Sequence, residues 1–186
     1  MNPMLKTLVS GAAIVLASLP ALAQTVGPQG ETATPTSAIV VPEASADAVR
    51  AGGYTAALLW HDQSDFVNAV SAGATAEFAR FGIEVVATTS AAFDAAQQRS
   101  DIETALAKSP SIILSLPLDP VTSAAAFAEA RDMGVKLVFL SNLPAGYTHP
   151  DDYAAIVTDD LFQMGKQAAD ALAASMGGEG TVGWIY

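Results

Sequence analysis

The fold is decided by the stretch Gly53-Tyr-Thr-Ala-Ala-Leu-Leu-Trp-His-Asp-Gln-Ser-Asp-Phe66. Its first half contains a short, unbroken apolar run from Ala56 to Trp60. A short run that is apolar on both faces is typical of a central strand in a parallel sheet. The residues that follow, His61 to Asp65, are all polar. Because ligands of open parallel sheets bind beyond the carboxyl ends of the strands, we expect a binding site here.

The rest of the sequence alternates between predicted strands and predicted helices. Helical periodicity is clearest after the first strand, where Phe66, Val70, Ala74 and Phe78 recur at a spacing of four. Short connections and this alternation predict an α/β fold with a doubly wound parallel sheet. The predicted strands span residues 54–61, 83–87, 112–116, 135–140 and 153–157, and a sixth begins at 181.

Several helix boundaries are marked by capping residues. The spacing of Asp94–Gln97 is that of a capping box, so we expect a helix to begin there. Asp119-Pro120 predicts an N-cap followed by proline at the first helical position, and Gly134 predicts the end of that helix. Asp159 or Asp160 is expected to cap the last helix, which ends at Gly177-Gly178.

The first 23 residues have the pattern of a secretory signal peptide. Lys6 supplies the positive start, residues 8–19 form an apolar core, and Ala21-Leu22-Ala23 is a cleavage site. A membrane anchor is the alternative, but the apolar run is short for a membrane span. We therefore expect export to a bacterial periplasm, without stable membrane insertion after cleavage. Residues 24–42, rich in Pro, Gly and Thr, predict a flexible N-terminus.

Composition excludes several classes of function. The chain has no cysteine, so disulfides, thiol nucleophiles and cysteine metal sites are absent. Its formal net charge of −11 at pH 7 disfavours nucleic acid as a partner, because phosphate would be repelled.

Motifs for catalysis are missing as well. No glycine-rich dinucleotide motif, P-loop or G-x-S-x-G sequence occurs. His61 and His149 lack metal-ligand spacing, so no metal or cofactor is expected. A catalytic group made of His61, Asp62 and Ser64 would need a geometry that such close neighbours on one loop seldom reach. The sequence predicts a binding protein and not an enzyme.

Three stretches together resemble a known family: AALLWHDQSDFVNAVSAGATAEFARFGIEVV, DAAQQRSDIETALAKSPSIILSLPLDPVTSAAAFAEARDMGVKLVFLSN and AAIVTDDLFQMGKQAADALA. Their order is similar to that in periplasmic substrate-binding proteins of ABC transporters, of the ribose- and galactose-binding type. Lactose-repressor-like regulators share this fold in their ligand-binding cores. The resemblance covers about residues 53–186, nearly all of the predicted globular part.

The resemblance implies two lobes that close on a ligand about a hinge. Residues 43–157 would form the first lobe, and residues 158–186 would begin the second. Because Trp184–Tyr186 ends the sequence in an apolar, β-prone run, we expect a C-terminally truncated chain or fragment. Half a binding site implies that the isolated chain binds its ligand poorly.

The resemblance also implies ligand contacts at the strand ends. Phe66 matches an aromatic that stacks on the sugar ring, and Ser64 stands where Asn or Asp is usual. Ser141-Asn142 replaces the Asp-Arg of ribose binders, and Leu116 stands where a polar residue often precedes proline. The missing arginine argues against an ordinary pyranose or furanose and favours a sugar alcohol or another polyol.

Each candidate residue has a structural alternative. The backbone could satisfy His61, and the helix dipole could explain Asp62 and Asp65. Phe66 could begin the core stripe of its helix, whereas Trp60 is expected in the core. Capping is the expected role of the aspartates at 119, 159 and 160. The predicted ligand-binding set is His61, Asp62, Ser64, Phe66, Ser141 and Asn142.

The resulting hypothesis is an exported solute-binding protein that delivers a sugar, sugar alcohol or similar polyol to an ABC permease. A ligand-sensing module for a chemoreceptor or sensor kinase is the alternative, because both use the same fold. A secreted α/β enzyme is a further, less favoured hypothesis. A repressor core conflicts with the signal peptide.

Overall fold

A computed structural model of the chain describes residues 26–183. The predicted signal peptide and Trp184–Tyr186 lie outside the described residues. Strands and helices alternate along the chain as the sequence predicts. The elements are a 3-10 helix, η1 (Thr36–Ala38), then α1 (Glu43–Ala51), β1 (Thr55–Trp60), α2 (Asp65–Arg80), β2 (Glu84–Ser90), α3 (Ala95–Leu106), β3 (Ile112–Ser115), α4 (Ala124–Asp132), β4 (Lys136–Leu140), β5 (Ala155–Val157) and α5 (Leu161–Ser175).

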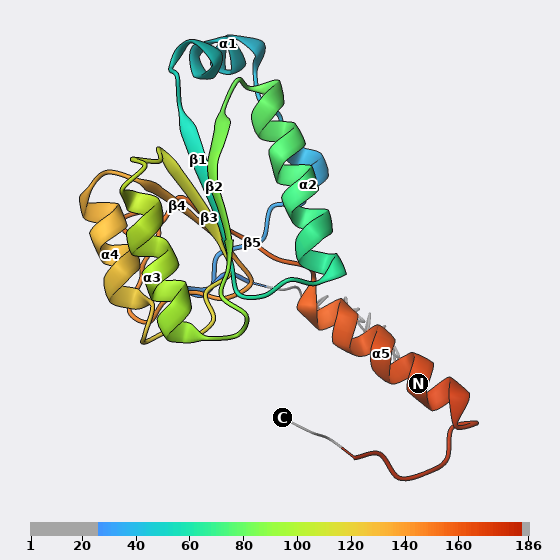
Figure 1. Cartoon of the computed structure of the whole chain (residues 1–186). Helices are drawn as coiled ribbons and strands as arrows, with labels where there is room; N and C mark the ends of the chain where they lie inside the picture. Colours follow the sequence, from blue (N-terminus) through green and yellow to red (C-terminus); the bar gives the residue numbers. More distant parts are fainter. Residues whose placement is uncertain (1–25, 184–186) are drawn as a thin grey trace, which may run out of the picture.

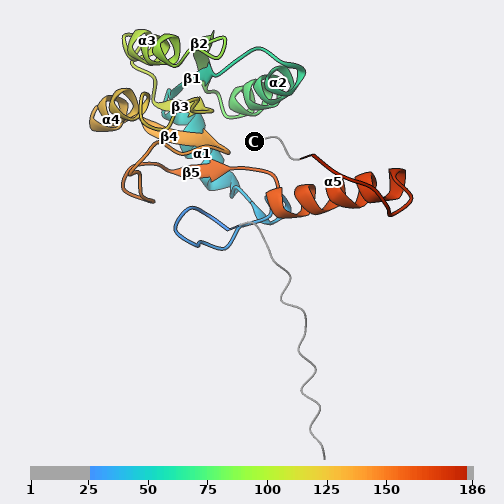
Figure 2. The same ribbon diagram turned by 90° about the horizontal axis from the view of Figure 1, so that it is seen from below.

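The five strands of the sheet pair in parallel, in the order β2-β1-β3-β4-β5 (Figures 1 and 2). β1 pairs with β2 on one side and β3 on the other, so Leu58 lies between Thr88 and Leu114. β1 is buried from Ala56 to Trp60, as expected for a strand apolar on both faces. The predicted α/β fold with a doubly wound parallel sheet is confirmed.

Helices cover both faces of the sheet. Figure 1 shows α3 and α4 on one face and α2 on the other. On the α3–α4 face, Ala57 and Leu59 of β1 belong to a core cluster that includes Ile102 and Phe127. On the α2 face, the buried cluster is Leu58, Trp60, Val67, Leu114 and Leu140. α5 extends away from the sheet, and none of its residues is buried (Figures 1 and 2).

Two predicted caps are confirmed. Asp94 accepts hydrogen bonds from the backbone N–H groups of Ala96 and Gln97, at 2.8 and 3.1 Å. Gln97 does not complete the capping box, because its amide donates to Asp101 instead. At the start of α5, Asp160 accepts from the N–H of Gln163 at 3.1 Å.

The helix predicted to begin at Pro120 begins at Ala124 instead. Asp119 accepts from the N–H groups of Val121 and Thr122, at 3.1 and 2.5 Å, and so caps a turn ahead of the helix. Hydrogen bonding from Thr122 holds the pKa of Asp119 below its usual range. The sixth strand is also not observed in its described part, because residues 181–183 have no regular structure.

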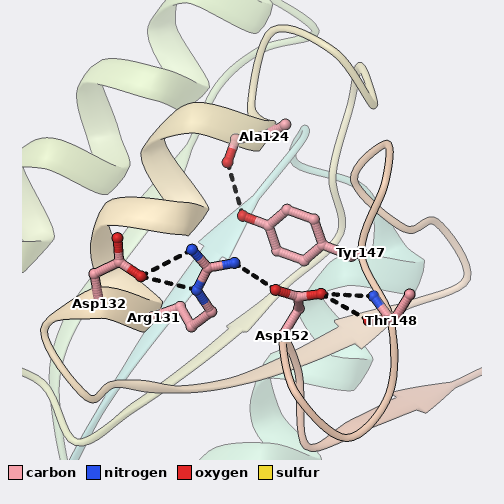
Figure 3. A network of polar contacts seen from close by, with 6 residues as sticks. All are labelled: Ala124, Arg131, Asp132, Tyr147, Thr148 and Asp152. Atoms are coloured by element: carbon pink, nitrogen blue, oxygen red, sulfur yellow. Dashed lines mark hydrogen bonds and ion pairs between the residues drawn. The ribbon is translucent and has the colours of Figure 1, made fainter.

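A polar network fixes the long loop between β4 and β5 (Figure 3). Asp152 pairs with Arg131 of α4 and accepts from the N–H and hydroxyl of Thr148, at 2.8 and 3.0 Å. The hydroxyl of Tyr147 donates to the carbonyl of Ala124 at 2.7 Å. Burial disfavours the charged phenolate and raises the pKa of Tyr147 to about 12. These bonds hold the loop against α4.

The segment before α1 contacts the same loop. The side-chain amide of Gln29 donates to the carbonyl of Tyr147 at 3.2 Å and accepts from the hydroxyl of Tyr153 at 3.3 Å. Figure 2 shows this segment beside β5. Nearly all of residues 26–42 are exposed, so Gln29 provides a specific link between the segment and the folded core.

We expect Asp152→Ala to lower the midpoint of thermal unfolding at pH 7 by about 2–4 °C, because three donors lose their acceptor. Hydrogen bonding from Thr148 lowers the pKa of Asp152 in the folded state. A lowered pKa stabilises the fold above the ordinary aspartate pKa, and that contribution is lost as the pH falls through the folded value. The difference between wild type and Asp152→Ala should therefore shrink in acid below about pH 4.

Asp47→Ala is the control for Asp152→Ala, because the Asp47 side chain is 69% exposed and bonds only to Arg50. An equal loss of stability in both variants, measured by circular dichroism, would contradict the role given to Asp152.

Candidate functional site

The strand order places a change in the direction of the chain connections at the carboxyl ends of β1 and β3. β1 continues into α2 on one face of the sheet, whereas β3 continues toward α4 on the other (Figure 1). Neighbouring strands whose connections leave in opposite directions form a topological switch point, where ligands of such sheets bind. His61 follows β1 and Leu116 follows β3, so both lie at this switch point.

His61, Asp62 and Ser64 form a contiguous polar group after β1. The Nε2 atom of His61 lies 3.3 Å from the Oδ1 atom of Asp62, and the Ser64 hydroxyl donates to the same oxygen at 3.3 Å. Ser64 also caps α2, because its Oγ accepts from the N–H of Val67 at 3.3 Å. The side chains of His61 and Asp62 are only 17% and 14% exposed. The loop therefore holds a partly buried carboxylate beside an imidazole.

Phe66 does not belong to the core stripe of its helix. Its side chain is exposed, whereas the next residue, Val67, is buried in the cluster between α2 and the sheet. Val70, Ala74 and Phe78 pack against that cluster, as the helical spacing predicts. Since Phe66 is not needed for packing, its ring is available at the start of α2 to contact a ligand.

Ser141 and Asn142 end β4 in a strained turn. Ser141 has a φ of +54°, and the N–H of Asn142 bonds to the carbonyl of Leu140 at 2.5 Å. A three-residue turn with positive φ at its centre is rare and strained, and such strain is concentrated at functional sites. The Asn142 amide donates to the carbonyl of Pro117 at 2.9 Å, which leaves its oxygen as the group to offer a ligand.

The side chain of Gln98, in α3, bonds to the backbone that follows β3. Its side chain is almost fully buried, donates to the carbonyl of Leu116 at 2.9 Å and accepts from the N–H of Leu118 at 2.8 Å. The buried Ser115 hydroxyl also donates to the carbonyl of Leu59 at 2.6 Å, which links β3 to β1. Together these bonds fix the backbone of the switch point.

Three buried polar atoms at the ends of β1 and β2 have no hydrogen-bond partner among the described residues: Nε1 of Trp60, Nδ1 of His61 and Oγ1 of Thr89. Trp60 is in the core, as expected. A fourth such atom, Oδ2 of Asp101, lies within α3, so unpaired polar atoms are not confined to the candidate site.

A separate cavity of about 510 Å³ lies beside β5. It is formed between the segment before α1 and residues around β5, including His149, Tyr153 and Thr158. Of the predicted ligand-binding residues, only Ser141 lines it. The cavity therefore adjoins the β4 end of the candidate site but does not contain the polar group after β1.

The structure thus brings the predicted residues together in two sets. One set lies at the end of β1, where His61 and Ser64 each contact Asp62. Phe66 follows at the start of α2. The other set, Ser141 and Asn142, is tied to the neighbouring strand ends by bonds to Val157 and Pro117. Within residues 26–183, no hydrogen bond, ion pair or ring contact joins the two sets.

The sequence analysis missed Gln98 and Phe93. Gln98 occupies the same helical stripe as Ile102, Ala105 and Leu106, and a polar residue in such a stripe signals a buried hydrogen-bonding role. Phe93 lies in the turn before α3, where its ring meets the His61 ring at a centroid distance of 5.5 Å. No periodic pattern in the sequence marks that position.

Residues 26–183 contain no cluster of three or more acidic, histidine or cysteine side chains that could hold a metal ion. Within the same range, no helix is both long and apolar enough to cross a membrane.

A family model for the periplasmic binding protein domain matches residues 41–186. No curated protein sequence matches the chain. Solved structures that resemble it include an ABC transporter solute-binding protein from Mycobacterium smegmatis with bound glycerol. That protein is 24% identical at a TM-score of 0.60, and the match covers 69% of this chain and 43% of the other.

Two further structures are similar. The myo-inositol binding protein of Caulobacter is 20% identical at a TM-score of 0.54, with 65% of this chain and 40% of the other covered. The fructose-binding periplasmic domain of a hybrid two-component system is 16% identical at a TM-score of 0.59, with 68% and 41% covered. The chain thus spans about two fifths of the length of these proteins.

We expect Gln98→Leu to destabilise the protein by about 1–3 kcal/mol, because the carbonyl of Leu116 and the N–H of Leu118 lose their partners. Gln97→Leu is the matched control, since Gln97 is exposed and its side chain bonds only to Asp101. The control should change the unfolding free energy by less than about 0.5 kcal/mol. Urea unfolding measures both, and equal effects would contradict the bridging role of Gln98.

Proposed function

This chain belongs to the family of periplasmic binding proteins, and we propose from that premise that it captures a small polyhydroxylated ligand for an ABC importer. Members of this family bind solutes and are not enzymes. The proposed ligand is a sugar, a sugar alcohol or a similar polyol. The proposed site lies at the carboxyl ends of β1, β3 and β4.

One observation carries the proposal: the exposed ring of Phe66 directly follows the polar group of His61, Asp62 and Ser64. Sugars and polyols have hydroxyl groups that need hydrogen-bond partners and C–H groups that need an apolar surface. A carboxylate accepts hydrogen bonds from hydroxyls more strongly than a neutral group does. An exposed aromatic beside such a carboxylate supplies both kinds of contact.

The second set of residues supports a neutral ligand. Ser141 offers a hydroxyl, and Asn142 offers its amide oxygen while its amide nitrogen bonds to Pro117. Neither residue carries a charge, and no arginine stands at this strand end. A polyol, whose hydroxyls both donate and accept, fits these groups better than an anionic sugar.

We further propose that residues 43–157 form one ligand-binding lobe and that residues 158–186 begin a second. The position of α5 away from the sheet, with no buried residue, supports this division. Closure of two lobes around a ligand would create the state that a permease recognises. The proposed location is the periplasm, reached through cleavage of the predicted signal peptide at residues 1–23.

A sensing role is the second candidate. One similar structure is the fructose-binding periplasmic domain of a hybrid two-component system. The same ligand-dependent closure could therefore act on a receptor instead of a permease. Loss of ligand uptake when the gene is deleted would favour transport, whereas loss of a transcriptional response with normal uptake would favour sensing.

The proposed function predicts weak, specific binding by the 186-residue chain. Glycerol, D-fructose and myo-inositol, titrated to millimolar concentrations, should shift the amide resonances of residues 61–66 and 141–142 in two-dimensional NMR spectra. Shifts confined to residues 153–158 would move the site to the cavity beside β5. Hydrolysis or oxidation of a probe, in place of reversible binding, would refute the binding function.

The two aspartates at the start of α2 provide a matched test of the site. Asp62→Asn should weaken binding of the best probe by about tenfold, because a charge-assisted hydrogen bond is lost. Asp65→Asn should change it by less than about twofold, since Asp65 is exposed and contributes mainly to the helix dipole. Similar losses in both variants would show that general charge, and not a contact by Asp62, controls binding.

A further inference from the structure

Phe93 is an exposed aromatic side chain beside the candidate site. It lies in the turn that joins β2 to α3, and its side chain is 65% exposed. Its ring meets the imidazole of His61 nearly at right angles, at 80°, with 5.5 Å between the ring centroids. The backbone N–H of Phe93 donates to the carbonyl of His61 at 2.8 Å. Both its side chain and its backbone therefore contact the residue that follows β1.

The backbone that presents Phe93 is strained. Ala92 and Phe93 have φ values of +50° and +61°, a region that side-chain-bearing residues seldom adopt. The turn is held by hydrogen bonds from Ala91 to the carbonyl of Trp60 at 3.0 Å, and from Asp94 to the carbonyl of Ala91 at 2.8 Å. Such positions are strained and persist only where the surrounding structure determines the conformation.

Packing and turn formation do not explain why phenylalanine occupies this position. Its ring is mostly exposed, so little core burial depends on it. The cap of α3 is made by Asp94, whose carboxylate acts regardless of the side chain before it. Glycine or asparagine would satisfy the turn with less strain. The contribution of the Phe93 ring must therefore come from its exposed surface and its contact with His61.

We propose that Phe93 is a further specificity-determining residue, which forms a second aromatic surface of the ligand site and favours cyclic over open-chain polyols. This inference rests on the proposed function. A ligand that binds beside Asp62 at the end of β1 would lie close to the exposed ring of Phe93, because that ring contacts the neighbouring His61 imidazole. A ring-shaped polyol presents a continuous C–H face to an aromatic surface, whereas glycerol does not. Phe93 thus adds a contact that depends on the shape of the ligand.

Two substitutions in the same turn separate the effect of the Phe93 ring on binding from the effect of backbone strain on stability. Phe93→Gly and Ala92→Gly both relieve a positive φ, so each should raise the midpoint of thermal unfolding by about 1–4 °C. Only Phe93→Gly removes the ring. It should weaken binding of myo-inositol and D-fructose by about three- to tenfold while changing glycerol binding by less than twofold. Ala92→Gly should leave all three affinities within about twofold of wild type, because Ala92 is exposed and bears no ring.

Phe93→Leu keeps an apolar side chain at the position and should lose most of the same affinity. Tyr54→Ala removes a similarly exposed aromatic at the opposite end of β1 and should have no effect on binding. NMR titration of the 186-residue chain measures each affinity, and circular dichroism measures stability.

The outcomes distinguish this inference from the proposed function. If wild type binds the cyclic probes and Phe93→Gly binds them equally well, the inference fails and the proposed function stands. An equal loss for glycerol and the cyclic probes would refute selection by shape. A marked fall in the stability of Phe93→Gly would show that the ring has a structural role. If wild type binds none of the three probes, the proposed function fails, and this inference fails with it.

Discussion

The burial of β1 on both faces is the constraint on which the rest of the structure depends. Its side chains point alternately into the α2 cluster and the α3–α4 cluster, so helices must cover both faces of the sheet. A strand in this position has no exposed side chains with which to bind a ligand. Side chains that can contact a ligand therefore occur only after the buried strand. At His61 the sequence changes from apolar to polar within one residue.

Hydrogen bonds between elements make the edge of the sheet rigid enough to serve as a site. Ser115 bonds to Leu59, Gln98 bonds to Leu116 and Leu118, and Asn142 bonds to Pro117. Each bond joins residues far apart in the sequence, so it forms only when the sheet has its final order. The strained turns at Ser141 and Phe93 occur at this same edge. Strain of this kind persists only where the surrounding structure holds it, and here the neighbouring strands supply the bonds.

The fold could be predicted because its signals are local and repeated. Apolar runs mark every strand of the sheet, and Asp94 and Asp160 cap helices where their spacing indicates. Asp119 caused the start of α4 to be predicted too early in the sequence. An aspartate that caps a turn and one that caps a helix have the same appearance in sequence.

Contacts between segments were harder to predict than the fold. Gln98 could be identified as buried from its helical spacing, but its partners at Leu116 and Leu118 depend on the strand order. Phe93 contacts His61 because parallel pairing brings the ends of β1 and β2 side by side, and the sequence places these residues more than 30 positions apart. Sequence reasoning therefore proposed candidates at the ends of two strands and missed Gln98 and Phe93, whose partners lie on other elements.

The charges around the site favour a neutral ligand. The carboxylate of Asp62 already accepts from Ser64 and lies beside His61, yet two carboxylate oxygens have about four acceptor positions, so a ligand hydroxyl can still donate to it. A ligand carboxylate or phosphate in the same place would meet this negative charge in a partly buried setting, where repulsion is screened less than in water. The formal net charge of −11 would repel it at longer range as well. A hydroxyl avoids both penalties because it is uncharged and can donate to Asp62. At the proposed site, the carboxylate of Asp62 therefore disfavours anionic ligands such as sugar acids and sugar phosphates.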